Sequence, residues 1–205
     1  MTKQQPLLKA LTLAREEFGR RVRSTMAWKA GVRMDEEGRL VVPFFGRTYR
    51  VPPPPGQEIP VVEEILLLHY LTRAAGLLPA GEWVSFKELP NGFIYHVPFN
   101  QRVVRPLLKV FGSDPQALLD AGRKLGGEEL SLGDAAVALR ALPRFPLAYV
   151  LWAGDEEFPP QATVLFDTTA PAYFSTEDCV WLAQLGVNYL AAAQKGVGFE
   201  NGKAL

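Results

Sequence analysis

The chain contains 205 residues, of which 48% are hydrophobic and 21% charged, and its 22 basic residues balance 22 acidic ones. A disordered chain has less apolar content and a larger net charge, and a neutral chain offers no overall attraction for nucleic acid, so both classes are excluded. A chain of this size buries about 70% of its unfolded surface, which is enough for a self-sufficient core.

The sequence contains no evident targeting or membrane segment. The first 18 residues lack the apolar stretch of a signal peptide, and the longest apolar run, Ile65–Leu68, is far shorter than a membrane span. A single cysteine, Cys179, cannot form an internal disulfide, an iron–sulfur cluster or a zinc finger. We therefore expect a soluble, cytoplasmic protein that binds neither membrane nor nucleic acid.

The N-terminal part predicts a helix and then a hairpin. Apolar residues recur at spacings of three and four through residues 6–24, as in an amphipathic helix. After Gly31 the apolar period becomes two, which predicts three strands within residues 32–51. Residues 52–55 are four prolines, and such a run is stiff. We expect one domain over 1–205, in which this connector either sets apart a small unit, 1–51, or straps one core.

Residues 60–76 predict the central helix of the fold, because apolar residues surround nearly its whole circumference. Glu63 and Glu64 are expected near the positive end of its dipole, and Gly76 is expected to end it. His69 lies within this apolar surface, so its side chain is expected to be buried or to line a cavity.

The next part of the chain predicts two short strands around a turn. Residues 82–86 and 93–97 contain the aromatic and β-branched residues that strands favour, and Pro90 begins the turn between them. In the second strand, Tyr95 and His96 are expected on opposite faces.

Two helical segments follow. The first begins at residue 100, and Pro106 is expected either to break it or to open a second helix. The second begins at Asp114, an N-cap residue followed by a proline, and ends near residue 126.

The C-terminal part predicts a meander of strands and a final helix. The strands are expected at residues 134–142, 147–153 and 162–166. Ser175 or Thr176 is expected to cap a helix that runs to about Gln194, before a loose tail at 196–205. Strands and helices come in separate runs, so the predicted fold is α+β, with a mostly antiparallel sheet packed against a central apolar helix and a C-terminal helix.

Common catalytic and cofactor-binding motifs are absent, and the chain has two histidines, His69 and His96. No close spacing of further ligands completes a zinc site, so we expect no metal site of that kind. Either histidine fits an axial ligand of a tetrapyrrole metal, and each also fits a structural role with a hydrogen bond to the backbone. Cys179 lies within the last predicted helix and is expected in the core.

Three cations fall on one stripe of the helical segment that begins at residue 100. Arg102, Arg105 and Lys109 are spaced at i, i+3 and i+7, provided that Pro106 kinks the helix only mildly. Such a stripe holds phosphates or the carboxylates of a ligand, or else it pairs with glutamates of the same chain.

Two further groups are weaker candidates. Trp83, Tyr95 and Trp152 are aromatic residues in predicted strands that either floor an apolar pocket or belong to the core. The acidic loop 155–157 fits a cation site, but a carboxylate pair with Asp167 is not expected, because the strand between them places Asp167 at the opposite end.

Four stretches together resemble one family: PFFGRTYRV at 43–51, ILLLHYLTRAAG at 65–76, GEWVSFKELPNG at 81–92 and GDEEFPPQATVLFD at 154–167. They are similar to the domain of unknown function 3786 family of anaerobic bacteria and archaea, over residues 10–190. The resemblance implies no catalytic residues. Some relatives resemble fusions with a four-cysteine iron–sulfur domain of the kind found in corrinoid proteins, so the resemblance implies an association with anaerobic corrinoid or one-carbon metabolism.

Three functions therefore stay open. The first is a binding or accessory protein that holds a corrinoid, another tetrapyrrole or small molecule, or a corrinoid or iron–sulfur protein partner, with His69 or His96 near the metal. The second is an enzyme that uses His96, Tyr95 and a carboxylate, Glu82 or Glu88, for acid–base chemistry in an apolar pocket. The third is an interaction module, whose sign would be a broad exposed apolar patch in place of a closed cavity.

Overall fold

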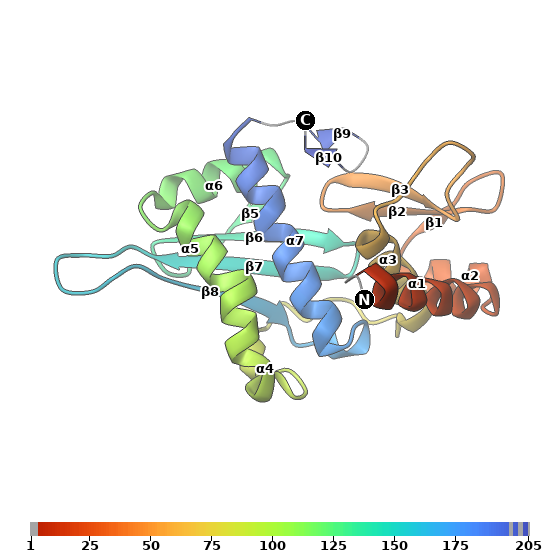
Figure 1. Ribbon diagram of the computed structural model, residues 1–205, viewed down its shortest axis with the longest axis horizontal. Coiled ribbons are helices and arrows are strands. Elements are labelled where there is room, and N and C mark those ends of the chain that lie inside the picture. The colour runs from red at the N-terminus through yellow and green to blue at the C-terminus, as the bar shows by residue number, and fades with distance from the viewer. Residues whose placement is uncertain (1–3, 197–198, 201–202, 205) are drawn as a thin grey trace.

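In a computed structural model, which describes residues 4–196, 199–200 and 203–204, the chain folds as an α+β protein with antiparallel sheets (Figure 1). The helices are α1 (Gln4–Gly19), α2 (Arg23–Ala30), α3 (Val61–Arg73), α4 (Gly92–Phe99), α5 (Arg105–Phe111), α6 (Pro115–Lys124) and α7 (Thr176–Gln194). Three short helical segments are η1 (Phe86–Glu88), η2 (Asn100–Val104) and η3 (Ala170–Ala172). The predicted fold class is confirmed.

The main sheet has five strands in the order β4-β8-β7-β6-β5, and every neighbouring pair is antiparallel. Its strands are β4 (Trp83–Ser85), β5 (Glu128–Glu129), β6 (Ala135–Leu142), β7 (Phe145–Trp152) and β8 (Gln161–Asp167). The meander β6–β7–β8 confirms the three strands predicted there. Half of the residues of β6 are alanine, and they form a strand because both neighbouring strands pair with β6 and bury it.

The second sheet contains the strands β1 (Arg33–Met34), β2 (Leu40–Phe44) and β3 (Arg47–Val51), as predicted for residues 32–51. The proline connector follows β3 directly, and its first peptide bond, Val51–Pro52, is cis. A short pair, β9 (Phe199–Glu200) and β10 (Lys203–Ala204), lies in the predicted tail 196–205, of which positions 197–198, 201–202 and 205 lie outside the described residues.

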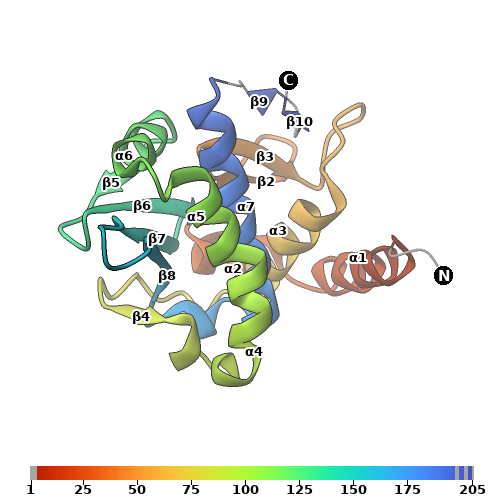
Figure 2. The same ribbon diagram turned by 60° about the vertical axis from the view of Figure 1, so that its left-hand side comes forward.

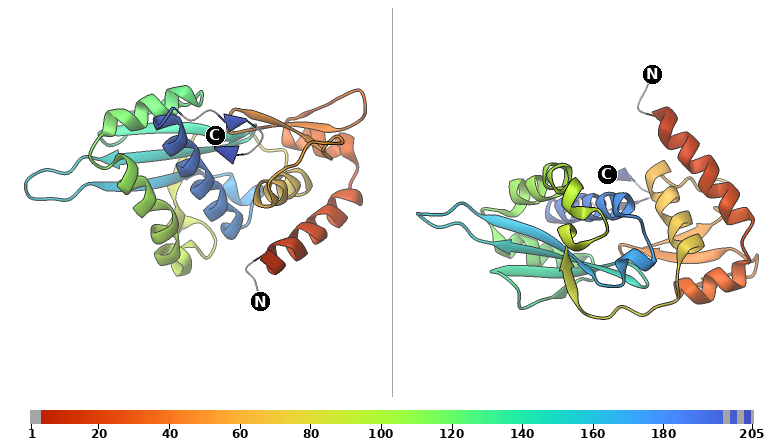
Figure 3. Two further views of the ribbon diagram at one scale, coloured as in Figure 1. Left: turned by 45° about the horizontal axis from the view of Figure 1, so that its top comes forward. Right: turned by 90° about the horizontal axis from the view of Figure 1, so that it is seen from below.

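The molecule has a sheet layer and a helix layer. Helices α4, α5, α6 and α7 cover one face of the five-stranded sheet, while α1, α2 and α3 surround the small sheet at the other end of the molecule (Figures 1, 2 and 3). Buried apolar side chains from both parts form one connected cluster. None of the helices in the described part of the chain has the length and apolar character that crossing a bilayer requires.

Helix α3 confirms the central helix predicted at 60–76, and its two acidic residues are buried. Glu63 accepts hydrogen bonds from Tyr49 and Tyr189, at 2.5 and 2.7 Å. Glu64 accepts two bonds of 2.7 Å from the Arg15 guanidinium, and hydrogen bonding to this carboxylate raises the pKa of the arginine. A buried carboxylate is tolerated only when paired in this way, so both glutamates hold other elements to α3.

Two elements differ from their prediction. The helix expected over residues 6–24 is two helices, because α1 ends at Gly19 and α2 begins again at Arg23. The strand expected at 93–97 is wrong: these residues form α4, a helix. Its backbone starts from Asn91, whose φ of 60° turns the chain in the left-handed region, and the helix that follows brings the ring of Phe99 onto that of Phe86.

Candidate functional site

Helices α4 and α5 form one rod with the segment η2 between them, and its start requires a glycine. At Gly92 a Cβ would overlap the carbonyl oxygen of Phe86, so a side chain there is excluded. Two turns further, the ring of Phe99 stacks on that of Phe86, with centroids 4.0 Å apart and planes inclined by 4°. These two contacts fix the beginning of the rod against the edge of the sheet.

The segment η2 is a π-helical turn, the wide form of helix that is frequent at functional sites. Pro98 precedes it and Pro106 follows it, and neither proline has an N–H group to donate to the preceding turn. The wider turn accommodates these two positions without ending the helix. Pro106 lies in the first turn of α5, which fits the expected alternative that it opens a second helix, and the helical backbone of Val104 before it keeps the rod continuous. Arg102 lies in the middle of the wide turn.

Arg102 is held in one orientation by α7. Its guanidinium lies over the ring of Trp181, 4.3 Å from the ring centre, and its Nε and Nη2 donate to Oε1 of Gln184 at 3.2 and 2.9 Å. Among the described residues no carboxylate pairs with it. An arginine that is stacked and oriented in this way loses little further entropy when it binds an anionic group.

A hollow of about 450 Å³ opens between this rod and the first turns of α7, and we call it the α7 cleft. It is lined by Asn91, Tyr95, Pro98, Arg102, Thr176, Glu177 and Val180. The hydroxyl of Thr176 donates to the carbonyl of Pro90 at 2.5 Å, which ties the start of α7 to the turn before α4. The volume of the α7 cleft is in the range of ligand sites, and its walls combine apolar surface with one fixed cation, Arg102.

His69 lies behind the same end of α7, where Asp178 binds it. Its Nδ1 is 2.9 Å from Oδ1 of Asp178, whose other oxygen accepts from Arg73 at 2.9 Å and from Ser175 Oγ at 2.7 Å. Burial by itself raises the pKa of Asp178, but the bonds from His69 and Ser175 and the charge of Arg73 outweigh it, so the pKa is lower than usual. Ser175 bonds to the aspartate and not to the imidazole, so the three residues do not form a nucleophile–base pair.

The imidazole faces a small hollow of about 110 Å³ between α1, α3 and α7. With the proton on Nδ1 bonded to Asp178, Nε2 is a free acceptor, and no described residue bonds to it. Glu177 lines both this hollow and the α7 cleft, so the two lie on either side of one stretch of α7. The hollow admits a few waters or a small group, and it is too small to enclose a tetrapyrrole ring.

The other predicted candidates lie elsewhere. His96 is on α4, where its Nδ1 bonds to the carbonyl of Phe93 at 2.7 Å, and it lines neither the cleft nor the small hollow. Neither it nor Tyr95 makes a hydrogen bond to Glu82 or Glu88 within the described part of the chain. The contact required for the predicted acid–base pair is therefore not present in this structure.

The predicted aromatic floor is not assembled. Trp83 pairs with Asp167 at one end of β8, and Trp152 pairs with Gln161 at the other end. Six residues of extended strand separate these ends by about 20 Å, so the two indoles cannot line one pocket. Of the three aromatic candidates, Tyr95 alone lines the α7 cleft.

Arg105 and Lys109 are exposed on α5. The expected alternative, that these cations and Arg102 pair with glutamates of the same chain, does not hold in the described residues, where none of the three forms an ion pair. The structure thus brings Tyr95 and Arg102 into one cleft, places His69 behind it, and leaves two cations exposed beside it.

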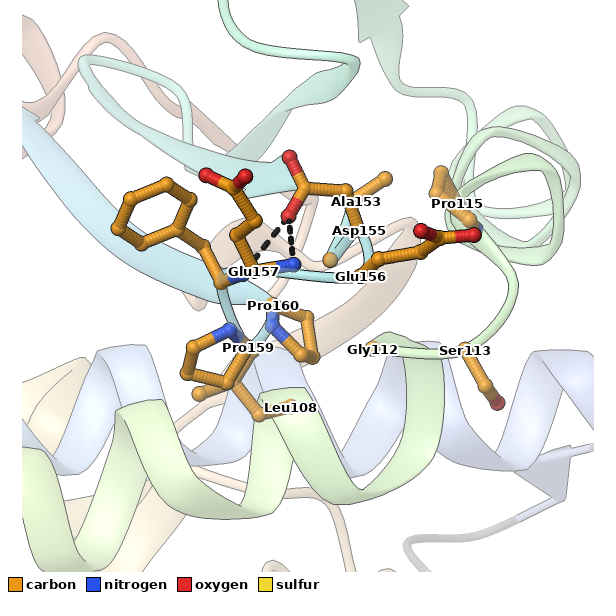
Figure 4. A pocket seen from close by; sticks show the side chains of 12 residues that line it. Leu108, Gly112, Ser113, Pro115, Ala153, Asp155, Glu156, Glu157, Pro159 and Pro160 are labelled. Atoms are coloured by element: carbon orange, nitrogen blue, oxygen red, sulfur yellow. Dashed lines mark hydrogen bonds between the residues drawn. The ribbon is translucent and has the colours of Figure 1, made fainter.

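The acidic loop between β7 and β8 borders a second hollow, of about 620 Å³, against the end of α5 (Figure 4). Within it, the Asp155 carboxylate accepts the backbone N–H groups of Phe158 and Glu157 at 2.7 and 2.8 Å, and these bonds lower its pKa. Asp167 lies at the far end of β8, as predicted, and accepts N–H groups of Ala80 and Gly81. Both carboxylates therefore organise loops.

Sequence reasoning missed the contribution of α7. Asp178 had a signal only as a helix-capping residue, and Glu177 and Trp181 had none, because they meet α3 and η2 across more than 75 positions of the chain. The described residues contain no group of three or more histidine, cysteine or acidic side chains that could hold a metal ion.

Comparison with known proteins gives the family and nothing finer. No curated protein and no solved structure matches the chain. One family model, the domain of unknown function DUF3786, matches residues 23–189, a span that contains the rod, the α7 cleft and both histidines. Because this match covers most of the chain, the protein belongs to the DUF3786 family.

Proposed function

We propose that this chain is an accessory protein that binds a partner protein through helix α4 and the adjoining α7 cleft. One observation carries the proposal. Phe93, Ile94, Tyr95 and Val97 lie on two turns of α4, and their exposed fractions are 70%, 70%, 55% and 53%. A group of large apolar side chains that a soluble domain leaves in water marks an interaction surface.

The composition of the cleft supports a protein partner over a small molecule. Tyrosine, tryptophan and arginine dominate the binding energy of protein interfaces, and here Tyr95, Trp181 and Arg102 lie beside the exposed apolar helix. The cleft is open on one side to this helix, since Tyr95 and Pro98 belong to both. A partner that covers α4 would insert one side chain into the cleft.

A photo-crosslinking experiment tests this proposal. The photoreactive amino acid p-benzoylphenylalanine is placed at position 94, and separately at position 13 on α1, where Leu13 has a similar exposure of 56%. Irradiation in a lysate of the protein's own organism is expected to give a discrete product of higher mass from position 94 alone. Equal products from both positions, or none from position 94, would contradict a specific surface on α4.

The family resemblance gives the proposed partner a direction: a corrinoid or iron–sulfur protein of anaerobic one-carbon metabolism. In the tetrapyrrole form of this proposal, Nε2 of His69 approaches the metal after the hollow beside it widens. An anoxic absorbance titration with hydroxocobalamin, and with haem in parallel, tests this form. A saturable shift that disappears in His69→Ala would support it, and an unchanged shift in that variant would remove His69 from this role.

Acid–base catalysis is the second candidate, and the contact between His69 and Asp178 favours it. A carboxylate that binds Nδ1 of an imidazole fixes its tautomer and leaves Nε2 as a base. The apolar hollow at Nε2 would have to admit a small substrate. Diethyl pyrocarbonate modifies accessible imidazoles, and under this candidate it is expected to react with His69 in the folded wild type. If His69 does not react, the hollow stays closed to small molecules and this candidate is wrong.

A further inference from the structure

We infer that the partner presents an acidic protein segment, which lies along the rod and pairs with the cations of α5. This inference rests on the proposed function and gives the chemistry of the partner. The outward side chains of the rod are apolar at its α4 end and basic at its α5 end.

The outward face of the rod is a ridge at four-residue spacing, formed by Phe93, Val97, Gln101, Arg105 and Lys109. Each of these residues is exposed. The residues two positions after Val97, Gln101, Arg105 and Lys109 are buried, and they are Phe99, Val103, Leu107 and Phe111. The π-helical turn in the middle keeps this spacing on one face, because it adds residues to that turn. The ridge is apolar over α4 and basic over α5.

The charge of the ridge is not balanced within the chain. No aspartate or glutamate occurs between Glu88 and Asp114, so no residue of the rod itself is acidic. Arg105 and Lys109 have no ion-pair partner among the described residues, whereas the exposed Arg20, Arg21 and Arg123 each have one. A cationic stripe that the fold leaves unpaired is complementary to negative charge on a partner.

The α7 cleft lies along the flank of this ridge, where Arg102 follows Gln101 and Pro98 follows Val97. Arg102 adds a third cation, which Trp181 and Gln184 already orient. Glu177, on the opposite wall of the cleft, repels an acidic group from that side and directs it toward Arg102. A carboxylate of the partner therefore anchors at Arg102, and further acidic groups meet Arg105 and Lys109.

A protein segment fits this surface better than a nucleic acid or a lipid bilayer. Phosphate backbones pair with cations but leave the four exposed apolar side chains of α4 uncovered. A bilayer is flat and does not fill a concave cleft of about 450 Å³. An acidic segment with apolar side chains covers both halves of the ridge, since its carboxylates face α5 and its apolar groups face α4.

The test uses a photo-crosslinker at position 101, the neutral centre of the ridge, in a nuclease-treated soluble lysate. The product is compared between the wild-type chain, the double variant Arg105→Glu/Lys109→Glu and Arg140→Glu. Arg140 is exposed on β6 and has no ion-pair partner among the described residues, so its variant is a matched control for charge. In the part of the chain that the structure describes, the three substituted side chains form no ion pair with a carboxylate. Equal thermal unfolding of all chains checks that they fold alike.

We expect the yield of the product to fall at least fivefold in the double variant and to be unchanged in Arg140→Glu. For the wild-type chain we expect a similar fall when NaCl is raised from 0.05 to 0.5 M, because the screening length becomes about threefold shorter. Mass spectrometry is expected to place the crosslink in a segment of net negative charge. A product that persists in the double variant, that maps to a neutral or basic segment or to a second copy of this chain, or that requires nucleic acid, would overturn this inference while the surface on α4 stands. Absence of any product from positions 94 and 101 would overturn the proposed function itself.

Discussion

Gly186 of α7 lies directly against the hydroxyl group of Tyr149 on β7. A Cβ at position 186 would overlap this hydroxyl oxygen, which itself donates to the carbonyl of Ala183 at 3.1 Å. The close approach seats the helix on the sheet.

Gly186→Ala is therefore expected to destabilise the fold. Alanine favours a helix by about 1 kcal/mol over glycine, but overlap with a buried side chain costs about 1–3 kcal/mol. We expect the free energy of unfolding in urea to fall. Gly19→Ala, at the end of α1 where no neighbouring atom lies within 4 Å, is the control and is expected to leave it unchanged or slightly higher. Equal effects of the two changes would contradict this packing.

Asp178 gives the stability a pH dependence. Burial raises the pKa of Asp178, but the bonds from His69 and Ser175 and the charge of Arg73 lower it by more than burial raises it. The folded-state pKa therefore lies below the unfolded value of about 3.9. A depressed pKa contributes stability that is present above about pH 4 and is lost as the pH falls through the folded value. Urea midpoints between pH 3 and 7 are thus expected to change less in Asp178→Asn than in the wild type.

The control for that measurement is Glu58→Gln, since Glu58 is exposed and forms no ion pair among the described residues. This variant is expected to keep the wild-type pH dependence. If Asp178→Asn also keeps it, the contact between His69 and Asp178 is not formed in solution.

Cys179 is expected to be inert in the folded protein. It is 1% exposed, and burial raises the pKa of its thiol far above the ordinary range, so almost no thiolate forms near neutral pH. Ellman's reagent at pH 8 should react with less than one tenth of the thiol while the protein stays folded, and with all of it in 6 M guanidinium chloride. Rapid reaction of the folded chain would show that the start of α7 opens, which would also disrupt the cleft.

The sequence was sufficient to predict most of the fold where hydrophobic period and turn residues agree. The strands of the meander, the central helix and the capping of α7 by Ser175 all follow from such local signals. The prediction failed at residues 93–97, whose aromatic and β-branched side chains favour a strand in isolation. The stacking of Phe99 on Phe86 and the close approach of Gly92 to the carbonyl of Phe86 favour a helix, and neither is visible in the local pattern.

The candidate site was only partly predictable for a related reason. Tyr95, His69 and Arg102 were identified by residue type, but their neighbours come from α7, more than 75 positions away. The pairing of His69 with Asp178 spans 109 positions and depends on how two helices pack. Such contacts arise from tertiary packing, which a single sequence does not display.

The buried glutamate of α3 supports a last prediction. Glu63 accepts one hydroxyl from β3 and one from α7, so it connects the small sheet to the helix that forms the cleft. Burial and the bond to Glu63 raise the pKa of Tyr49 to about 12, so this hydroxyl stays protonated and keeps donating at every ordinary pH. Tyr49→Phe and Tyr189→Phe each remove one donor and leave the ring, and each is expected to cost about 1.5–3 kcal/mol of unfolding free energy.

The double variant tests whether the two bonds act together. With both hydroxyls gone, the carboxylate remains buried without either tyrosine donor, which costs more than the loss of two separate bonds. We therefore expect the loss in Tyr49→Phe/Tyr189→Phe to exceed the sum of the single losses, as measured by urea unfolding at pH 7. Adding Glu63→Gln is expected to recover part of that loss, because a neutral amide is less costly to bury than a carboxylate. Strict additivity with no such recovery would show that water reaches Glu63, and that the connection between the small sheet and α7 is looser than this packing implies.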